Sequence, residues 1–132
     1  MGRQSNNPSF NGTAGGTAAQ YTLGKRHTDG TLINSGANEI AIGIFTDDFV
    51  SGDIASLRSP TAGGEHKVKV KADGVNIAIG DILVGGASGK ALKLPAGAGT
   101  YYQTGIAQEA STADGDVIAV NPTGWGTKHV VP

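Results

Sequence analysis

The stretch Lys67-Val68-Lys69-Val70-Lys71-Ala72 alternates charged and apolar residues at every position. Successive side chains of a β-strand point to opposite faces of a sheet, so a period of two predicts a strand with its lysines in water and its valines in a core. The Asp73-Gly74 pair that follows is typical of a tight turn and ends the strand. This segment indicates a β fold.

Weaker forms of the same pattern occur before and after this segment. Residues 39–45 alternate, which predicts a strand with Ile40, Ile42 and Ile44 on one face. The best helical candidate, residues 107–113, is too short and has no apolar stripe. Short strands between glycine-rich turns are typical of a small β-barrel or β-sandwich, which we expect over residues 36–132. The other predicted strands lie at residues 53–57, 82–84, 90–94, 101–107 and 117–120.

One turn motif recurs, because a Gly-Asp pair directly precedes an apolar strand at three places. They are Gly52-Asp53-Ile54, Gly80-Asp81-Ile82 and Gly115-Asp116-Val117. Glycine supplies a positive φ angle, and the aspartate caps the turn through nearby backbone amides. The spacing between the copies is irregular, so the motif indicates shared turn chemistry and not a solenoid repeat.

The first third of the chain differs from the rest. Residues 1–35 are rich in Gly, Asn, Ser, Thr and Gln, and they carry neither a helical nor a strand period. We expect an extended N-terminal arm that is mobile in solution. We predict that it becomes ordered on contact with a partner, and an arm that stays disordered is the alternative. Its candidate partner-contact residues are the isolated apolar side chains of Phe10, Tyr21, Leu23, Leu32 and Ile33.

Composition limits the classes of function. The chain has 132 residues, of which 22 are glycine, and 38% are apolar, which is enough for one modest core. Lys and Arg number 10 against 11 Asp and Glu, so the near-neutral chain lacks the basic patch of a nucleic-acid-binding protein. We expect no membrane partner either, because no apolar run is long enough to span a bilayer and the N-terminus does not resemble a signal peptide. The absence of cysteine excludes disulfides and thiolate metal sites.

No catalytic motif is complete. The loop of residues 86–91 has Gly89-Lys90 but lacks the earlier glycine and the following Ser or Thr of a phosphate-binding loop. No Gly-x-Ser-x-Gly nucleophile elbow is present. The residues Asp47, Asp48 and Asp53 lack the spacing of a calcium loop. We therefore predict a protein that is not an enzyme and that has no cofactor and no metal, with unpaired histidines at His27, His66 and His129.

Four segments, taken in order, resemble one known family. They are Val68-Lys69-Val70-Lys71-Ala72, Ile79-Gly80-Asp81-Ile82-Leu83, Gly105-Ile106-Ala107-Gln108-Glu109 and Gly115-Asp116-Val117-Ile118-Ala119-Val120. Together they cover about residues 65–120, and their order resembles that of the tailed-phage capsid cement proteins, also called head decoration proteins.

The resemblance implies a structural virion protein on the outer surface of an icosahedral capsid, made in the cytoplasm of the host bacterium. Proteins of this family clamp neighbouring major capsid subunits against the internal pressure of packaged DNA. The implied partners are the major capsid protein and further copies of the chain itself, as a trimer at three-fold positions, with no direct contact to nucleic acid. The five apolar residues of the arm are then candidate capsid contacts. An adhesin-like module, or a lipoyl or biotinyl carrier with Lys90 at a hairpin tip, is the alternative.

Overall fold

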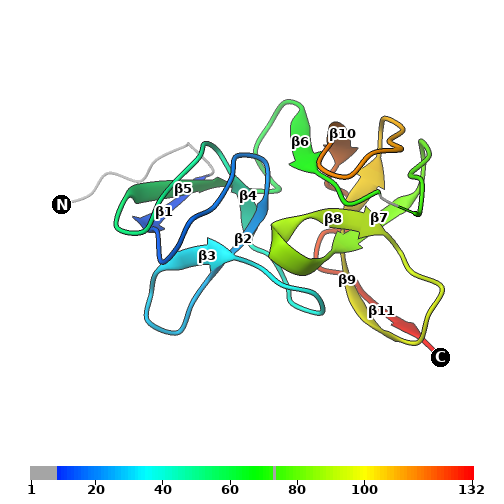
Figure 1. Cartoon of the computed structure of the whole chain (residues 1–132), viewed down its shortest axis with the longest axis horizontal. Helices are drawn as coiled ribbons and strands as arrows, with labels where there is room; N and C mark the ends of the chain where they lie inside the picture. The colour runs from blue at the N-terminus through cyan, green and yellow to red at the C-terminus, as the bar shows by residue number, and fades with distance from the viewer. Residues whose placement is uncertain (1–8, 73) are drawn as a thin grey trace.

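A computed structural model describes residues 9–72 and 74–132, and the described chain is all-β, with two antiparallel sheets side by side (Figure 1). The first sheet has five strands in the order β1-β5-β4-β2-β3. Its strands are β1 (Ser9–Thr13), β2 (Leu23–Arg26), β3 (Leu32–Asn34), β4 (Gly43–Phe45) and β5 (Ile54–Arg58).

The second sheet has the order β6-β10-β9-β7-β8, and β11 also pairs with β9. A single parallel bridge between Val70 and Ala91 joins the two ends of this order. The sheet therefore curls toward a barrel but is not closed by a continuous ladder. Its strands are β6 (His66–Lys69), β7 (Ile82–Gly85), β8 (Ala91–Lys93), β9 (Gly99–Ala107), β10 (Val117–Asn121) and β11 (Lys128–Val131), with a short 3-10 turn, η1 (Ala87–Gly89), before β8.

Two hydrophobic cores lie on either side of the first sheet. Neighbouring residues of β4 serve different cores, with Ile44 in the larger one and Phe45 in the smaller one. Strand β4 is buried on both faces for this reason. The main core consists of Leu23, Ala41, Ile44, Val68, Val70, Ala72, Ile77, Leu83, Ala91, Ala107, Ile118 and Val120. The small core consists of Ala14, Ala18, Leu32, Phe45, Ala55 and Leu57.

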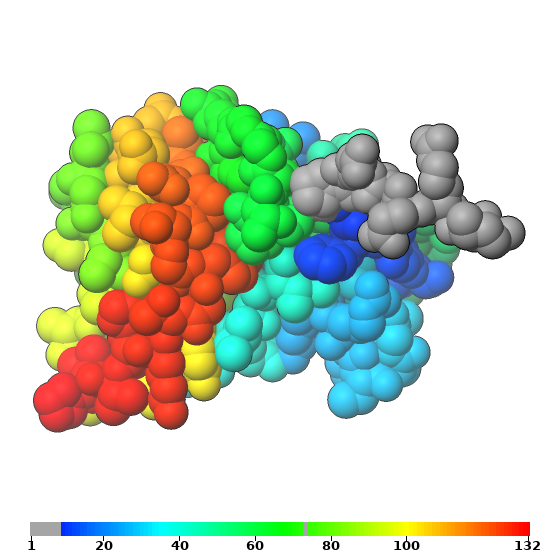
Figure 2. Space-filling view, turned by 180° about the vertical axis from the view of Figure 1, so that it is seen from behind, coloured from blue at the N-terminus to red at the C-terminus, as the bar shows by residue number. Residues whose placement is uncertain are grey.

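The strand predicted over residues 67–72 is confirmed for residues 67–69, which belong to β6, and Val70 adds one isolated bridge after it. Val68 and Val70 are buried in the main core, whereas Lys67 and Lys71 are exposed. Figure 2 shows the green segment that contains β6 between the N-terminal part of the chain, in blue and cyan, and the C-terminal part, in yellow to red. This valine face therefore meets side chains from both sheets, which gives it a central position in the core.

The three Gly-Asp turns also form as predicted. Their glycines have φ angles of 93°, 93° and 86° at Gly52, Gly80 and Gly115. The carboxylates of Asp53 and Asp81 accept hydrogen bonds from the backbone amides three residues earlier, at 2.9 and 2.8 Å. The third copy differs, because Asp116 accepts a hydrogen bond from the hydroxyl of Ser111, at 2.8 Å.

The strand predicted at residues 39–45 is shorter than expected. Only residues 43–45 form β4, and the chain before them turns at Asn38, whose φ angle is 63°. The expected common face of Ile40, Ile42 and Ile44 is wrong. Ile40 is exposed, Ile42 packs on the small core, and Ile44 lies in the main core.

The expected boundary between an arm and a β domain at residue 35 does not describe residues 9–35. These residues form β1, β2 and β3, three of the five strands of the first sheet. Tertiary pairing with β4 and β5 supplies the hydrogen bonds that the local sequence does not predict. Residues 1–8 of the expected arm lie outside the described residues. The strand β11 was likewise not predicted.

Candidate functional site

The five predicted contact residues fall into two groups in the structure. Leu23 and Leu32 are fully buried, one in each core, so they hold the fold together and do not reach a partner. Phe10 is 40% exposed, and Tyr21 and Ile33 are half-buried. Phe10, Leu23, Leu32 and Ile33 lie on strands of the first sheet, and Tyr21 lies in the turn before β2.

Phe10 lies at an outer edge of the molecule. It belongs to β1, the end strand of the first sheet as far as the chain is described, and its partner in the register is Leu57. Directly opposed residues of an antiparallel pair share a face, so the phenyl ring lies on the same face of the sheet as Leu57 of the small core. Ile54 at the start of β5 is 77% exposed and was not among the predicted contact residues. The visible signal for it was the Gly52-Asp53 turn, because a residue that directly follows a turn need not be buried in the core.

Tyr21 lies at the junction of the two sheets. Its φ angle is 69°, and its carbonyl oxygen accepts a hydrogen bond of 2.8 Å from the amide of Lys69. Beside it is an open groove of about 250 Å³ with both signs of charge on its walls. The residues that line the groove are Tyr21, Ile44, Thr46, Arg58, Glu65 and Lys67.

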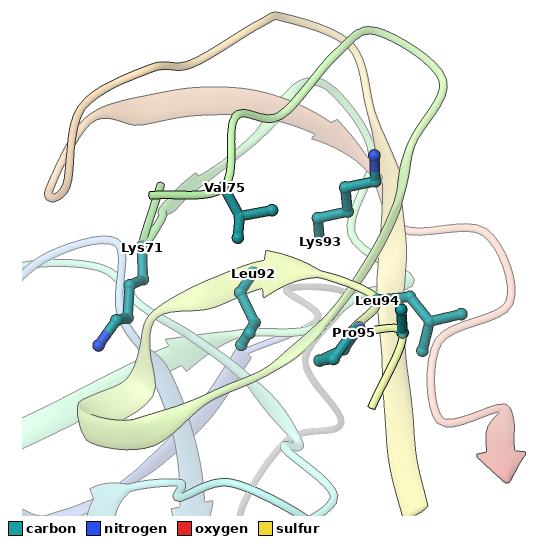
Figure 3. Close-up of a pocket in the computed structure, with 7 residues that line it drawn as sticks. Lys71, Val75, Leu92, Lys93, Leu94 and Pro95 are labelled. Carbon is teal, nitrogen blue, oxygen red and sulfur yellow. The ribbon is translucent and has the colours of Figure 1, made fainter. Parts of the chain in front are cut away.

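A second hollow, of about 390 Å³, lies at the edge of the second sheet (Figure 3). We call it the seam pocket, because it lies beside β8, where the two ends of the second sheet approach each other. Figure 3 shows Leu92 in the middle of the pocket, with Val75 on the chain that passes opposite. Its lining consists of Lys71, Val75, Leu92, Lys93, Leu94, Pro95 and Ala96. The sequence analysis assigned no role to these residues, although the proline after β8 and the apolar Val75 in a turn were visible signals.

The acidic residues considered for calcium hold the backbone instead. Asp47 accepts a hydrogen bond from the amide of Asp48, at 2.8 Å, and Asp48 accepts one from the amide of Gln20, at 2.8 Å. Asp53 is engaged in its own turn. Within residues 9–72 and 74–132, no group of three or more His, Asp or Glu side chains is arranged to hold a metal ion. None of the helices in the described part of the chain is long and apolar enough to cross a membrane.

Lys90 does not stand at a free hairpin tip. It follows η1, and its ammonium nitrogen lies 3.2 Å from a carboxylate oxygen of Asp114. This geometry differs from the exposed hairpin tip that the carrier alternative assumes.

Comparisons with known proteins show a likeness of fold. The sequence matches no protein-family model and no curated protein. The fold, however, is similar to the crystal structure of the head fiber gp8.5 N base in bacteriophage phi29, with a TM-score of 0.67 and 19% sequence identity. The likeness covers 92% of this chain and 98% of that one. This agreement establishes the same all-β, sandwich-like fold over nearly the whole chain.

Proposed function

We propose that this chain is a structural protein of a tailed-phage virion that sits on the outside of the icosahedral head and holds neighbouring major capsid subunits together. The observation that carries the proposal is the likeness of nearly the whole chain to the base of a phage head fiber. The order of the four segments between residues 68 and 120 also supports it, because that order resembles the order in the tailed-phage capsid cement proteins.

The physical character of the protein agrees with such a role. A clamp needs no catalytic groups, and it gains stability from each partner that binds only the folded state. Closed symmetry around a three-fold position leaves no strand edge free to aggregate, so we propose a trimer on the capsid. We further propose that the protein is not an enzyme, carries no cofactor and contacts neither nucleic acid nor membrane directly.

The test is to mix the purified protein with undecorated heads of the phage that encodes it and to pellet the heads. We expect co-sedimentation at a fixed number of copies per head, and a three-dimensional reconstruction with density at three-fold or quasi-three-fold positions. Density only at two-fold positions would exclude the trimer, and failure to sediment would exclude the function.

The same preparation separates the alternatives. An intact mass increased by a lipoyl or biotinyl group on Lys90 would favour a carrier module. Binding to glycans without binding to heads would favour an adhesin.

A further inference from the structure

The seam pocket is where the curled second sheet remains open. The amide of Lys71 donates a hydrogen bond of 2.8 Å to the carbonyl oxygen of Ala91, next to the bridge between Val70 and Ala91. In a parallel ladder the next bond would join the amide of Lys93 to the carbonyl oxygen of Lys71. Among the described residues that bond is not formed, so the two ends of the sheet separate at this point.

Strand β8 therefore presents unpaired backbone groups to the pocket. The amide of Gly86 donates a hydrogen bond to the carbonyl oxygen of Lys90, and the amide of Leu94 donates one to the carbonyl oxygen of Ile82. These two bonds show which residues of β8 direct their backbone groups toward β7. In an antiparallel pair every second residue bonds to its partner strand, so the N–H and C=O of Lys93 point away from β7. Within the described ranges, no backbone group bonds to them from the other side. An extended segment from another protein could occupy this edge by adding a strand.

The side chains around the edge define the chemistry of that segment. Val75 is 58% exposed and lines the hollow together with the half-buried Leu92 and Leu94, so an apolar side chain entering here would be removed from water. The two charged residues of the lining are both lysines, and among its described residues none is acidic. Asp73 lies outside the described residues.

The two lysines differ in how free they are. The ammonium of Lys93 lies 3.7 Å from the carboxylate of Asp81, which partly neutralises it. Lys71 is exposed and has no salt bridge within the described chain. The pocket thus offers an apolar floor flanked by two lysines, of which Lys71 has no salt bridge among the described residues. This lining is complementary to a segment with an apolar side chain next to a carboxylate.

We infer that the seam pocket receives an extended segment of the major capsid protein that carries a bulky apolar residue next to an acidic one. The inference rests on the proposed function and names the contact by which it is achieved. The seam pocket and the Phe10 edge lie at separate parts of the molecule, on β8 and on β1 (Figure 1). Two separate contact surfaces are what a protein needs in order to join two neighbouring subunits.

The experiment compares two pocket variants with two matched controls in the co-sedimentation assay with undecorated heads. The pocket variants are Lys71→Glu and Val75→Glu, both at exposed positions whose change leaves the cores intact. The controls, Lys128→Glu and Val130→Glu, make the same changes at exposed positions on β11. Thermal unfolding of all four checks that they are folded, and sedimentation velocity records the oligomeric state.

We expect each pocket variant to bind heads at least tenfold more weakly than the wild type, with both controls unchanged. Raising the NaCl concentration should weaken the wild type more than Lys71→Glu, because the charge interaction is screened. Wild-type affinity in both pocket variants would overturn the inference and leave the proposed function standing. A loss of self-association without a loss of head binding would also overturn it, since the occupant would then be a second copy. If the wild type itself does not bind heads, the proposed function and the inference fail together.

Discussion

The indole Nε1 of Trp125 donates a hydrogen bond of 2.8 Å to the backbone carbonyl oxygen of Ala41, which lies 84 positions earlier in the chain. The indole ring also packs against the main core, to which the first sheet contributes Leu23 and Ile44. The loop after β10 is thereby fastened to the segment that leads into β4. A single side chain thus links the two sheets by both packing and a directed bond.

Replacing Trp125 with phenylalanine should keep much of the packing and remove the hydrogen bond. The carbonyl of Ala41 would then lose its partner, and we expect the free energy of unfolding to fall by about 1 kcal/mol. Trp125→Ala should cost more, since it removes the packing as well. Urea denaturation followed by circular dichroism measures both. Equal stability of Trp125→Phe and wild type would mean that the bond does not contribute.

The same tryptophan tests whether the two sheets unfold together. It is the only tryptophan in the chain, so its fluorescence reports the junction, whereas circular dichroism reports all strands. Because the main core is built from both sheets, we expect the two signals to give coincident transitions in the wild type. Two separate midpoints would show that the sheets are independent units.

Gly24 is required by packing and not by turn geometry. A Cβ atom at this position would lie 2.5 Å from Leu57 Cδ2 and 2.7 Å from Phe45 Cε2, both in the small core. We expect Gly24→Ala to destabilise the protein by about 1–3 kcal/mol, the usual cost of overpacking. Gly97→Ala is the matched control, because no atom lies within 4 Å of the added carbon there. Thermal melts of the two variants should differ by several degrees, and equal melting temperatures would refute the packing argument.

Local chemistry predicted the parts of the fold that depend on neighbours in sequence. The alternation of residues 67–72 predicted its strand and its buried face, and the Gly-Asp pairs predicted three turns. Strands β1 to β3 were missed because long-range pairing forms them. Leu23, for example, is opposite Ile44 in the register, and Gly24 is a poor strand former that is chosen for its small size.

The candidate site was predictable to a smaller extent. An isolated apolar residue in a polar segment can be a contact or a core residue, and the sequence does not distinguish Phe10 from Leu23. The difference is one of position, since Phe10 lies on an edge strand and Leu23 on an interior strand. The seam pocket was not predictable, because it depends on where the chain after Lys71 separates from β8.

Glu39 gives the fold a dependence on pH. Hydrogen bonds from the Lys25 ammonium and from the amide of Gly36, together with the positive charge of Lys25, hold the pKa of this carboxyl below its usual value. A lowered pKa contributes stability that is present above the unfolded pKa and is lost as the pH falls through the folded pKa. The effect should stay below about 1 kcal/mol, because the side chain is exposed enough to be screened.

The variant Glu39→Gln isolates this contribution. We expect it to be slightly less stable than the wild type at pH 7, with the difference shrinking as the pH falls through the acidic range. Denaturant midpoints of both proteins at several pH values measure the difference. A gap that stays constant with pH would show that the ionised carboxylate is not its cause.

The last prediction concerns which of the five apolar N-terminal residues touch the capsid. Leu23 and Leu32 are buried, so we expect Leu23→Ala to cost about 2–5 kcal/mol of stability, as is usual for a core leucine. Phe10→Ala and Tyr21→Ala change side chains that reach the surface, so each should leave most of the stability and weaken binding to undecorated heads about tenfold.

Deleting residues 1–35 does not serve as this test, because it removes β1 to β3 and exposes the small core around Phe45 and Leu57. Point variants are needed instead, and Ile33→Ala, on the half-buried face of β3, is a third one to compare. In the co-sedimentation assay, the loss of head binding should then be larger for variants of more exposed side chains, whatever the hydrophobicity of the side chain that is removed. Unchanged binding by both Phe10→Ala and Tyr21→Ala would place the capsid contact elsewhere, and the seam pocket variants would show whether the second sheet provides it.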